Sequence, residues 1–120
     1  MAMTKRPDGT LEQDILDVLW AAEGPLQPGE VRDRLPVPLA YTSVATVLGR
    51  LHAKGLVERH ESGRAFTYQA SFDESQLAVK RIAELYSSAS DKRQVLAGFL
   101  GSLPKKDIAA VRAMLGEAGD

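Results

Sequence analysis

The chain has 120 residues, of which 44% are hydrophobic, so it can form one small domain plus an association segment. It has no cysteine, which excludes disulfide scaffolds, thiolate nucleophiles and cysteine-based metal sites. No apolar run is long enough to span a bilayer, so we expect a cytoplasmic protein without membrane insertion. The net charge of −1 argues against a generally basic nucleic-acid binder, and any such site must depend on local charge placement.

The first part of the chain predicts a flexible tail followed by two helices. Residues 1–9 are expected to be the tail. The stretch Thr10–Gln13 fits a capping box with its threonine as N-cap, and the apolar stripe after it predicts a helix ending at Gly24-Pro25. A second, short helix is expected to begin with Pro28 at its first position and to end before Pro36.

The stretch 40–55 predicts a third, amphipathic helix with Thr42 as its N-cap and Gly55 just beyond its end. Its buried stripe consists of Val44, Val47, Leu48 and Leu51. The opposite face has mostly small side chains: Thr42, Ser43, Thr46, Gly49, Arg50 and Ala53. No acidic residue occurs between Arg34 and Val57, and the acids of the chain are expected to cluster away from this face.

Such a face favours insertion into the major groove of DNA. Small side chains let the helix backbone approach closely, hydroxyls can meet phosphates or base edges, and Arg50 can bind guanine through two hydrogen bonds. The alternative for this helix alone is an ordinary core helix whose exposed face lacks acids.

Two strands are predicted next, at 56–61 and 64–70, joined by a tight turn at Ser62-Gly63. Pairing across this turn places Arg59 opposite Phe66 and Val57 opposite Tyr68. Val57, Phe66 and Tyr68 then share a face that can cover the helices. A hairpin directly after three helices is the wing of a winged helix-turn-helix domain, and Arg64 at its tip is placed to reach a phosphate or the minor groove. The alternative for Arg64 is a weak, exposed ion pair with Glu61.

The chain from 72 to 120 is predicted to be a helical dimerisation segment that follows a winged-helix DNA-binding domain over 10–71. Its three short helices, at 73–88, at 91–103 and after Pro104, have more apolar surface than one layer of helices can hide. The expected interface residues are Leu77, Ile82, Leu85, Val95, Leu96, Phe99, Leu100, Leu103, Val111 and Leu115. The alternative is that these helices fold back onto their own domain. We favour a homodimer, because a winged domain of roughly sixty residues is marginal on its own.

Several motifs resemble the penicillinase repressor family, which includes the methicillin-resistance and copper-transport repressors. They are LEQDILDVLW, PGEVRDRL, AYTSVATVLGRLHAKGLVER and GRAFTYQA, within Leu11 to Ala70, with weaker similarity over VLAGFLGSLPKKDIAAVRAML. The resemblance implies a mainly α fold with a small β-hairpin wing, and a homodimeric repressor that binds an inverted repeat in double-stranded DNA. The residues expected at the DNA are Tyr41, Thr42, Ser43, Thr46, Arg50, Lys54 and Arg64.

No catalytic, cofactor-binding or metal site is expected, and the chain is not predicted to be an enzyme. His52 and His60 are the only histidines, and the sequence has neither a zinc-ligand cluster nor a glycine-rich phosphate loop. The cysteine clusters of the copper-responsive relatives are also absent. Two further interpretations stay open, namely a winged helix that contacts proteins and a winged-helix regulator that senses a small ligand.

The resemblance also implies a route of release. Some relatives are inactivated when a receptor protease cuts an Asn-Phe bond in the dimerisation segment. This chain has Gly98-Phe99 at the corresponding place, so the phenylalanine matches and the asparagine does not. A regulatory protease acting near Gly98-Phe99 therefore stays open as a partner.

Overall fold

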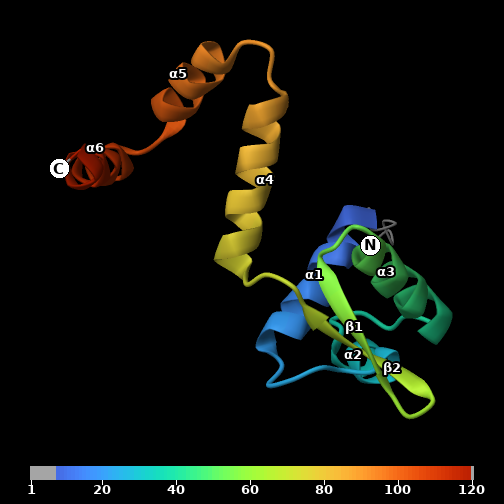
Figure 1. The fold of residues 1–120 in the computed structure, drawn as a ribbon. Coiled ribbons are helices and arrows are strands. Elements are labelled where there is room, and N and C mark those ends of the chain that lie inside the picture. Colours follow the sequence, from blue (N-terminus) through green and yellow to red (C-terminus); the bar gives the residue numbers. More distant parts are fainter. Residues whose placement is uncertain (1–7, 120) are drawn as a thin grey trace, which may run out of the picture. The chain divides into compact units, whose positions relative to one another are not determined.

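The computed structural model describes residues 8–119, which form helices and one two-stranded antiparallel sheet (Figure 1). In chain order the elements are α1 Asp8–Ala21, α2 Pro28–Arg34, α3 Tyr41–Ala53, β1 Val57–Ser62, β2 Ala65–Ala70, α4 Glu74–Ser88, α5 Lys92–Ser102 and α6 Lys105–Gly119. Three helices followed by a hairpin confirm the mainly α fold with a β-hairpin wing. No helix of this described part is long and apolar enough to cross a membrane.

Two of the predicted N-caps are wrong. α1 extends upstream to Asp8, so Thr10 lies inside the helix and most of the predicted tail falls outside the described residues. α3 begins at Tyr41 with Ala40 as its N-cap, and the Ala40 carbonyl already accepts the first backbone hydrogen bonds of the helix. Thr42 is therefore the second residue of the helix, and its side chain is exposed.

α1 ends at Ala21, three residues before the predicted stop at Gly24-Pro25, whereas the ends of α2 and α3 follow the predicted chemistry. Pro28 is the first residue of α2, and the Gln27 N–H donates to Glu30 Oε1 at 2.9 Å. After α3, Gly55 has a φ of +77°, the left-handed conformation that glycine adopts without a Cβ penalty. The Gly55 N–H donates to the carbonyl of His52 and the next N–H donates to that of Leu51, which is the Schellman pattern.

The hairpin has a different register from the predicted one. Its turn is Gly63-Arg64, and the pairs are Val57 with Ala70, Arg59 with Tyr68, and Glu61 with Phe66. Glycine takes the first turn position because a positive φ is needed there, and Gly63 has a φ of +66°. A turn at Ser62-Gly63 would place Ser62 in that conformation, and no described non-glycine residue has a positive φ.

The two-residue shift in register preserves which side chains share a face. Val57 and Tyr68 still point into the core, but Phe66 lies nearer the turn and is 40% exposed. The guanidinium of Arg59 lies 4.4 Å from the centre of the Phe66 ring. The other edge of β2 is tied to the helices, because Leu26 and Tyr68 exchange two backbone hydrogen bonds of 2.9 and 2.7 Å.

The first compact unit ends at Leu77, beyond the boundary expected after residue 71. Its core is made of Ile15, Leu16, Val18, Leu19, Leu26, Val31, Val44, Val47, Leu48, Leu51, Val57, Tyr68 and Leu77. The Trp20 indole N–H donates to the Phe72 carbonyl at 2.7 Å and so attaches this end of the unit to α1. The prediction of Leu77 as an interface residue is therefore corrected, because its side chain is only 3% exposed and packs in this core.

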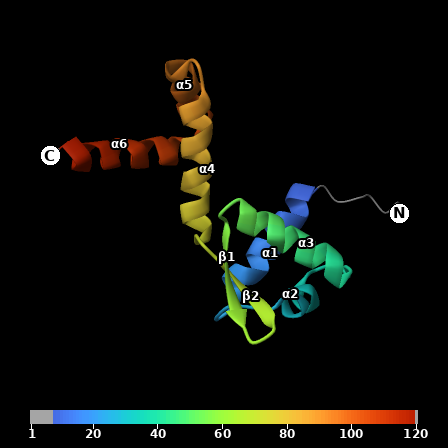
Figure 2. The same cartoon turned by 45° about the vertical axis from the view of Figure 1, so that its right-hand side comes forward.

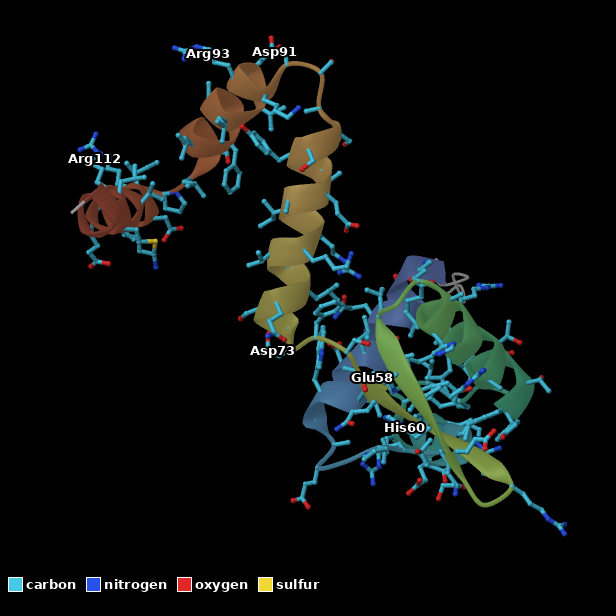
Figure 3. The ribbon with its side chains drawn as sticks, viewed as in Figure 1. Glu58, His60, Asp73, Asp91, Arg93 and Arg112 are labelled. Atoms are coloured by element: carbon cyan, nitrogen blue, oxygen red, sulfur yellow. The ribbon has the colours of Figure 1, made fainter. Side chains whose placement is uncertain are left out.

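The second unit, from Ala78 onward, consists of the rest of α4 together with α5 and α6. Its helix ends match the predicted ones to within about one residue. Asp91 caps α5 by accepting the Gln94 N–H at 3.0 Å (Figure 3). Much of the apolar surface is exposed: Val79, Ile82, Leu85, Val95, Leu96, Phe99, Leu100, Met114 and Leu115.

Candidate nucleic-acid interface

The outer face of α3 is exposed over its whole length. Tyr41, Thr42, Ser43, Thr46 and Arg50 are all exposed, and four of them share one shallow hollow of about 320 Å³. The residues lining that hollow are Leu11, Thr42, Ser43, Thr46, Val47 and Arg50. The structure thus brings together the hydroxyls and the arginine that the sequence predicts for DNA binding.

The backbone of α3 is accessible from the same side. A Cβ atom added at Gly49 would meet nothing within 4 Å, and Ala53 one turn further is exposed. The start of the helix also presents N–H groups that favour an anion such as a phosphate. α3 is fixed from behind by Val44, Leu48 and Leu51, none of which is exposed. A rigid helix with small outward side chains can enter a groove of DNA closely.

Arg32 of α2 lies beside this surface, although the sequence does not predict it there. The Arg32 guanidinium lies 6.0 Å from the centre of the Tyr41 ring, and its side chain is 40% exposed. The same group also lies 3.4 Å from the Asp33 carboxylate. The spacing of apolar residues in α2 predicts only that Val31 points into the core. It does not predict that Arg32 lies near Tyr41, the first residue of α3.

The wing supplies two further cations. The turn at the free end of the hairpin can be followed in Figure 2. Arg64 lies in this turn and is exposed, and the described residues contain no ion pair between it and Glu61. In the sheet, the residue of β2 that lies opposite Glu61 is Phe66. Arg59, which was not predicted as a site residue, lies over that ring and is exposed.

The opposite face of β1 has a histidine and an acid. His60 Nε2 lies 3.6 Å from Glu58 Oε1, and both side chains are about half exposed (Figure 3). Within residues 8–119, no group of three His, Cys, Asp or Glu side chains lies close enough to hold a metal ion.

Lys54 differs from the other predicted DNA-binding residues. Its ammonium contacts both carboxylate oxygens of Glu12, at 2.8 and 3.0 Å. Glu12 belongs to α1, so the expectation that all acids cluster away from this surface is wrong. Sequence spacing offers no signal for this pair, because its partners are 42 positions apart and on different helices.

The chain resembles known proteins in sequence and in fold. The transcriptional regulator BlaI of Mycobacterium tuberculosis (strain CDC 1551 / Oshkosh) is 30% identical over 114 residues, covering 91% of this chain and 83% of that protein. The solution structure of the DNA-binding domain of the repressor BlaI matches with a TM-score of 0.51 and 30% identity, over 62% of this chain and 93% of that one.

A more distant match supports the fold alone. Bordetella bronchiseptica BpsR, whose DNA binding is regulated by 6-hydroxynicotinic acid, has a TM-score of 0.50 and 17% identity, over 96% of this chain and 84% of that one. The family model described as "Penicillinase repressor" matches residues 9–117. Because this match spans nearly the whole chain, the protein belongs to the penicillinase repressor family.

Proposed function

We propose that this protein is a sequence-specific transcriptional repressor that binds an inverted-repeat operator as a homodimer in the cytoplasm. The observation that carries the proposal is the exposed face of α3, where three hydroxyl side chains and Arg50 line one hollow. Its family consists of transcriptional regulators rather than enzymes. The relative with a solved DNA-binding domain supports extending DNA binding to this chain.

The residues of the first unit divide into two roles. Arg50, with Thr42, Ser43 and Thr46, reads base edges from α3 in the major groove. Tyr41 and Arg64 contact the phosphate backbone from the start of α3 and from the wing. Such contacts fix the position of the domain on the duplex without reading sequence. Arg32 joins this second group, because its guanidinium lies beside the Tyr41 ring.

Dimerisation is proposed through the second unit. A groove of about 560 Å³ is lined only by side chains of α4 and α5: Val79, Ile82, Ala83, Leu85, Tyr86, Val95, Leu96 and Phe99. Apolar surface of this extent in a water-soluble protein favours association with another apolar surface. A second copy offers the same surface, and a closed symmetric pair satisfies both at once. The remaining proposed interface residues are Leu100, Leu103, Val111 and Leu115.

The test of the proposed function begins with the operator, which selection of bound duplexes from a random DNA pool identifies. Arg50→Ala should then weaken operator binding by about 1–3 kcal/mol, because a guanine loses a bidentate partner. Binding is measured by gel-shift titration, with circular dichroism to verify that the variant is folded.

Arg34→Ala is the matched control, since it also removes one arginine. Arg34 is exposed and lines a different hollow, with Asp14 and Asp17 of α1. If the Arg50 and Arg34 variants bound the operator as tightly as the unmodified protein, α3 would not be the reading helix. Enrichment of no sequence from the pool would argue against a sequence-specific repressor altogether.

A further inference from the structure

We propose that Glu12 restrains DNA binding by holding the Lys54 ammonium away from phosphate. This inference rests on the proposed function and adds a residue that lowers the affinity of the same surface. In the free protein Lys54 is an ion-pair partner of α1, and its contribution to phosphate binding is made only when the pair opens. Glu12 therefore acts as a positioning residue.

The geometry of the pair is well defined from both sides. Both carboxylate oxygens of Glu12 accept from Lys54 Nζ, at 3.0 and 2.8 Å. The Glu12 side chain is only 13% exposed, whereas that of Lys54 is 54% exposed. Water and a phosphate can thus reach the ammonium, while the carboxylate is largely enclosed.

The backbones on both sides of the pair are also anchored. Lys54 is the C-cap of α3, and the hydrogen bonds of the Schellman motif around Gly55 fix the backbone at that point. Glu12 precedes Ile15 and Leu16, which are buried and hold α1 in the core. The pair therefore joins two helices whose relative position is set by the core of one unit.

The pair also lies at the edge of the proposed DNA surface. At 100° per residue, Lys54 falls on the same side of α3 as Ser43 and Arg50. Leu11, the neighbour of Glu12, lines the hollow with these two residues. A carboxylate beside a phosphate-binding surface repels the duplex and cancels the charge of the cation that it holds. A neutralised lysine then releases no counterion from DNA.

The effect expected is graded. The Lys54 side chain is 54% exposed, so a phosphate can compete with Glu12 for the ammonium and open the pair. Glu12→Gln keeps the shape of the enclosed side chain and should leave the fold intact. The protein should therefore bind DNA more weakly than the number of cations at the surface suggests, and log K should depend less steeply on log salt.

The experiment uses the full chain and a random-sequence duplex, with binding followed by fluorescence anisotropy over a series of KCl concentrations. Glu12→Gln keeps the shape of the side chain and removes its charge. It should raise affinity several-fold and steepen the dependence of log K on log salt by about one unit per bound subunit. The gain requires the Lys54 ammonium, so Glu12→Gln should raise affinity much less in a Lys54→Met background than in the unmodified protein.

Asp17→Asn is the matched control, because it removes one exposed acid of α1 whose hydrogen-bond partner is Gln13. It should raise affinity much less than Glu12→Gln. Glu12→Ala, with the same expected result, replaces the glutamine variant if thermal unfolding shows that variant to be destabilised.

Three results would overturn the inference: no gain in Glu12→Gln, an equal gain in Asp17→Asn, or a gain that persists in the Lys54→Met background. In each of them the unmodified protein still binds DNA, so the proposed function stands while the role of Glu12 fails. Absence of DNA binding by the unmodified protein would remove both.

Discussion

The cationic side chains at the proposed interface differ in the groups that they contact. Arg64 is exposed in a two-residue turn, Arg59 lies over the Phe66 ring, and Lys54 is paired with Glu12. Stacking on an aromatic ring orients a guanidinium without neutralising it, whereas a carboxylate neutralises its partner. The contribution of each cation to DNA binding therefore depends on its neighbour as well as on its exposure.

Arg64 should contribute affinity with little sequence preference. Arg64→Ala should weaken binding to the operator and to random DNA alike, and it should flatten the dependence of log K on log salt by about one unit per subunit. Salt titrations of both duplexes measure the effect. If the loss depended on one base position of the operator, Arg64 would be a base reader.

At the scale of elements, the end of α3 determines how the chain enters the wing. Gly55 adopts a left-handed conformation there, and β1 begins two residues later. Any L-residue at this position would strain the backbone or alter the direction in which the strand leaves. The same helix contains Gly49, which has ordinary helical geometry and open space around its Cα.

Replacing each of these two glycines by alanine should have opposite effects on folding stability. Gly55→Ala should destabilise the fold by about 1–2 kcal/mol, because a Cβ disfavours the left-handed region. Space is not the cause, since an added Cβ would meet nothing within 4 Å at either position. Gly49→Ala should stabilise the fold by roughly 0.5–1 kcal/mol. Urea denaturation followed by circular dichroism checks both, and equal stabilities would contradict the conformational argument.

Local chemistry makes most elements predictable from the sequence. Pro28 and Gly55 mark helix ends in the sequence, and the apolar stripe of α3 predicts its buried side. The predicted register of the hairpin is wrong, because the sequence Ser62-Gly63 does not reveal whether the glycine takes the first or the second position of the turn. In the structure Gly63 takes the first position of the turn. Each residue of β1 therefore pairs with a residue of β2 two positions beyond the predicted partner.

Contacts between distant residues could not be predicted in the same way. The spacing that predicts the apolar side of α4 does not say which apolar surface Leu77 meets, and it packs in the core of the first unit. The contacts of Arg32 with Tyr41 and of Lys54 with Glu12 depend on how helices pack, which no helical period encodes. These are the places where the candidate site departs from its prediction.

At the scale of the whole molecule, the chain combines a unit with a buried core and a unit with much exposed apolar surface. The described residues of α5 include none that is buried, although Val95, Leu96 and Phe99 are large and apolar. The proposed dimer buries them and links two reading helices. The second DNA contact then becomes effectively intramolecular.

Leu100→Glu should separate the subunits, since a charge buried without a partner is costly. Light scattering should detect monomers, while Trp20 fluorescence, a probe of the first unit, stays near that of the unmodified protein. Affinity for the full inverted repeat should fall by about two orders of magnitude, toward that for a half-site.

Gln94→Glu is the control, because it adds the same charge at an exposed, polar position of α5. A Leu100→Glu protein that remained dimeric and kept its operator affinity would place the dimer contact elsewhere. Cleavage of the Gly98-Phe99 bond, directly before Leu100, should have the same consequence as Leu100→Glu.

The Leu26–Tyr68 bridge has a consequence for the behaviour of the protein at high concentration. It occupies the outer edge of β2 and leaves β1 as the open edge of the sheet in the described chain. An open edge invites strands of other molecules to add to it, which begins aggregation. β1 counters this with four consecutive ionisable side chains, Glu58, Arg59, His60 and Glu61, all exposed. The wing can thus extend into solvent without becoming a template for fibre growth.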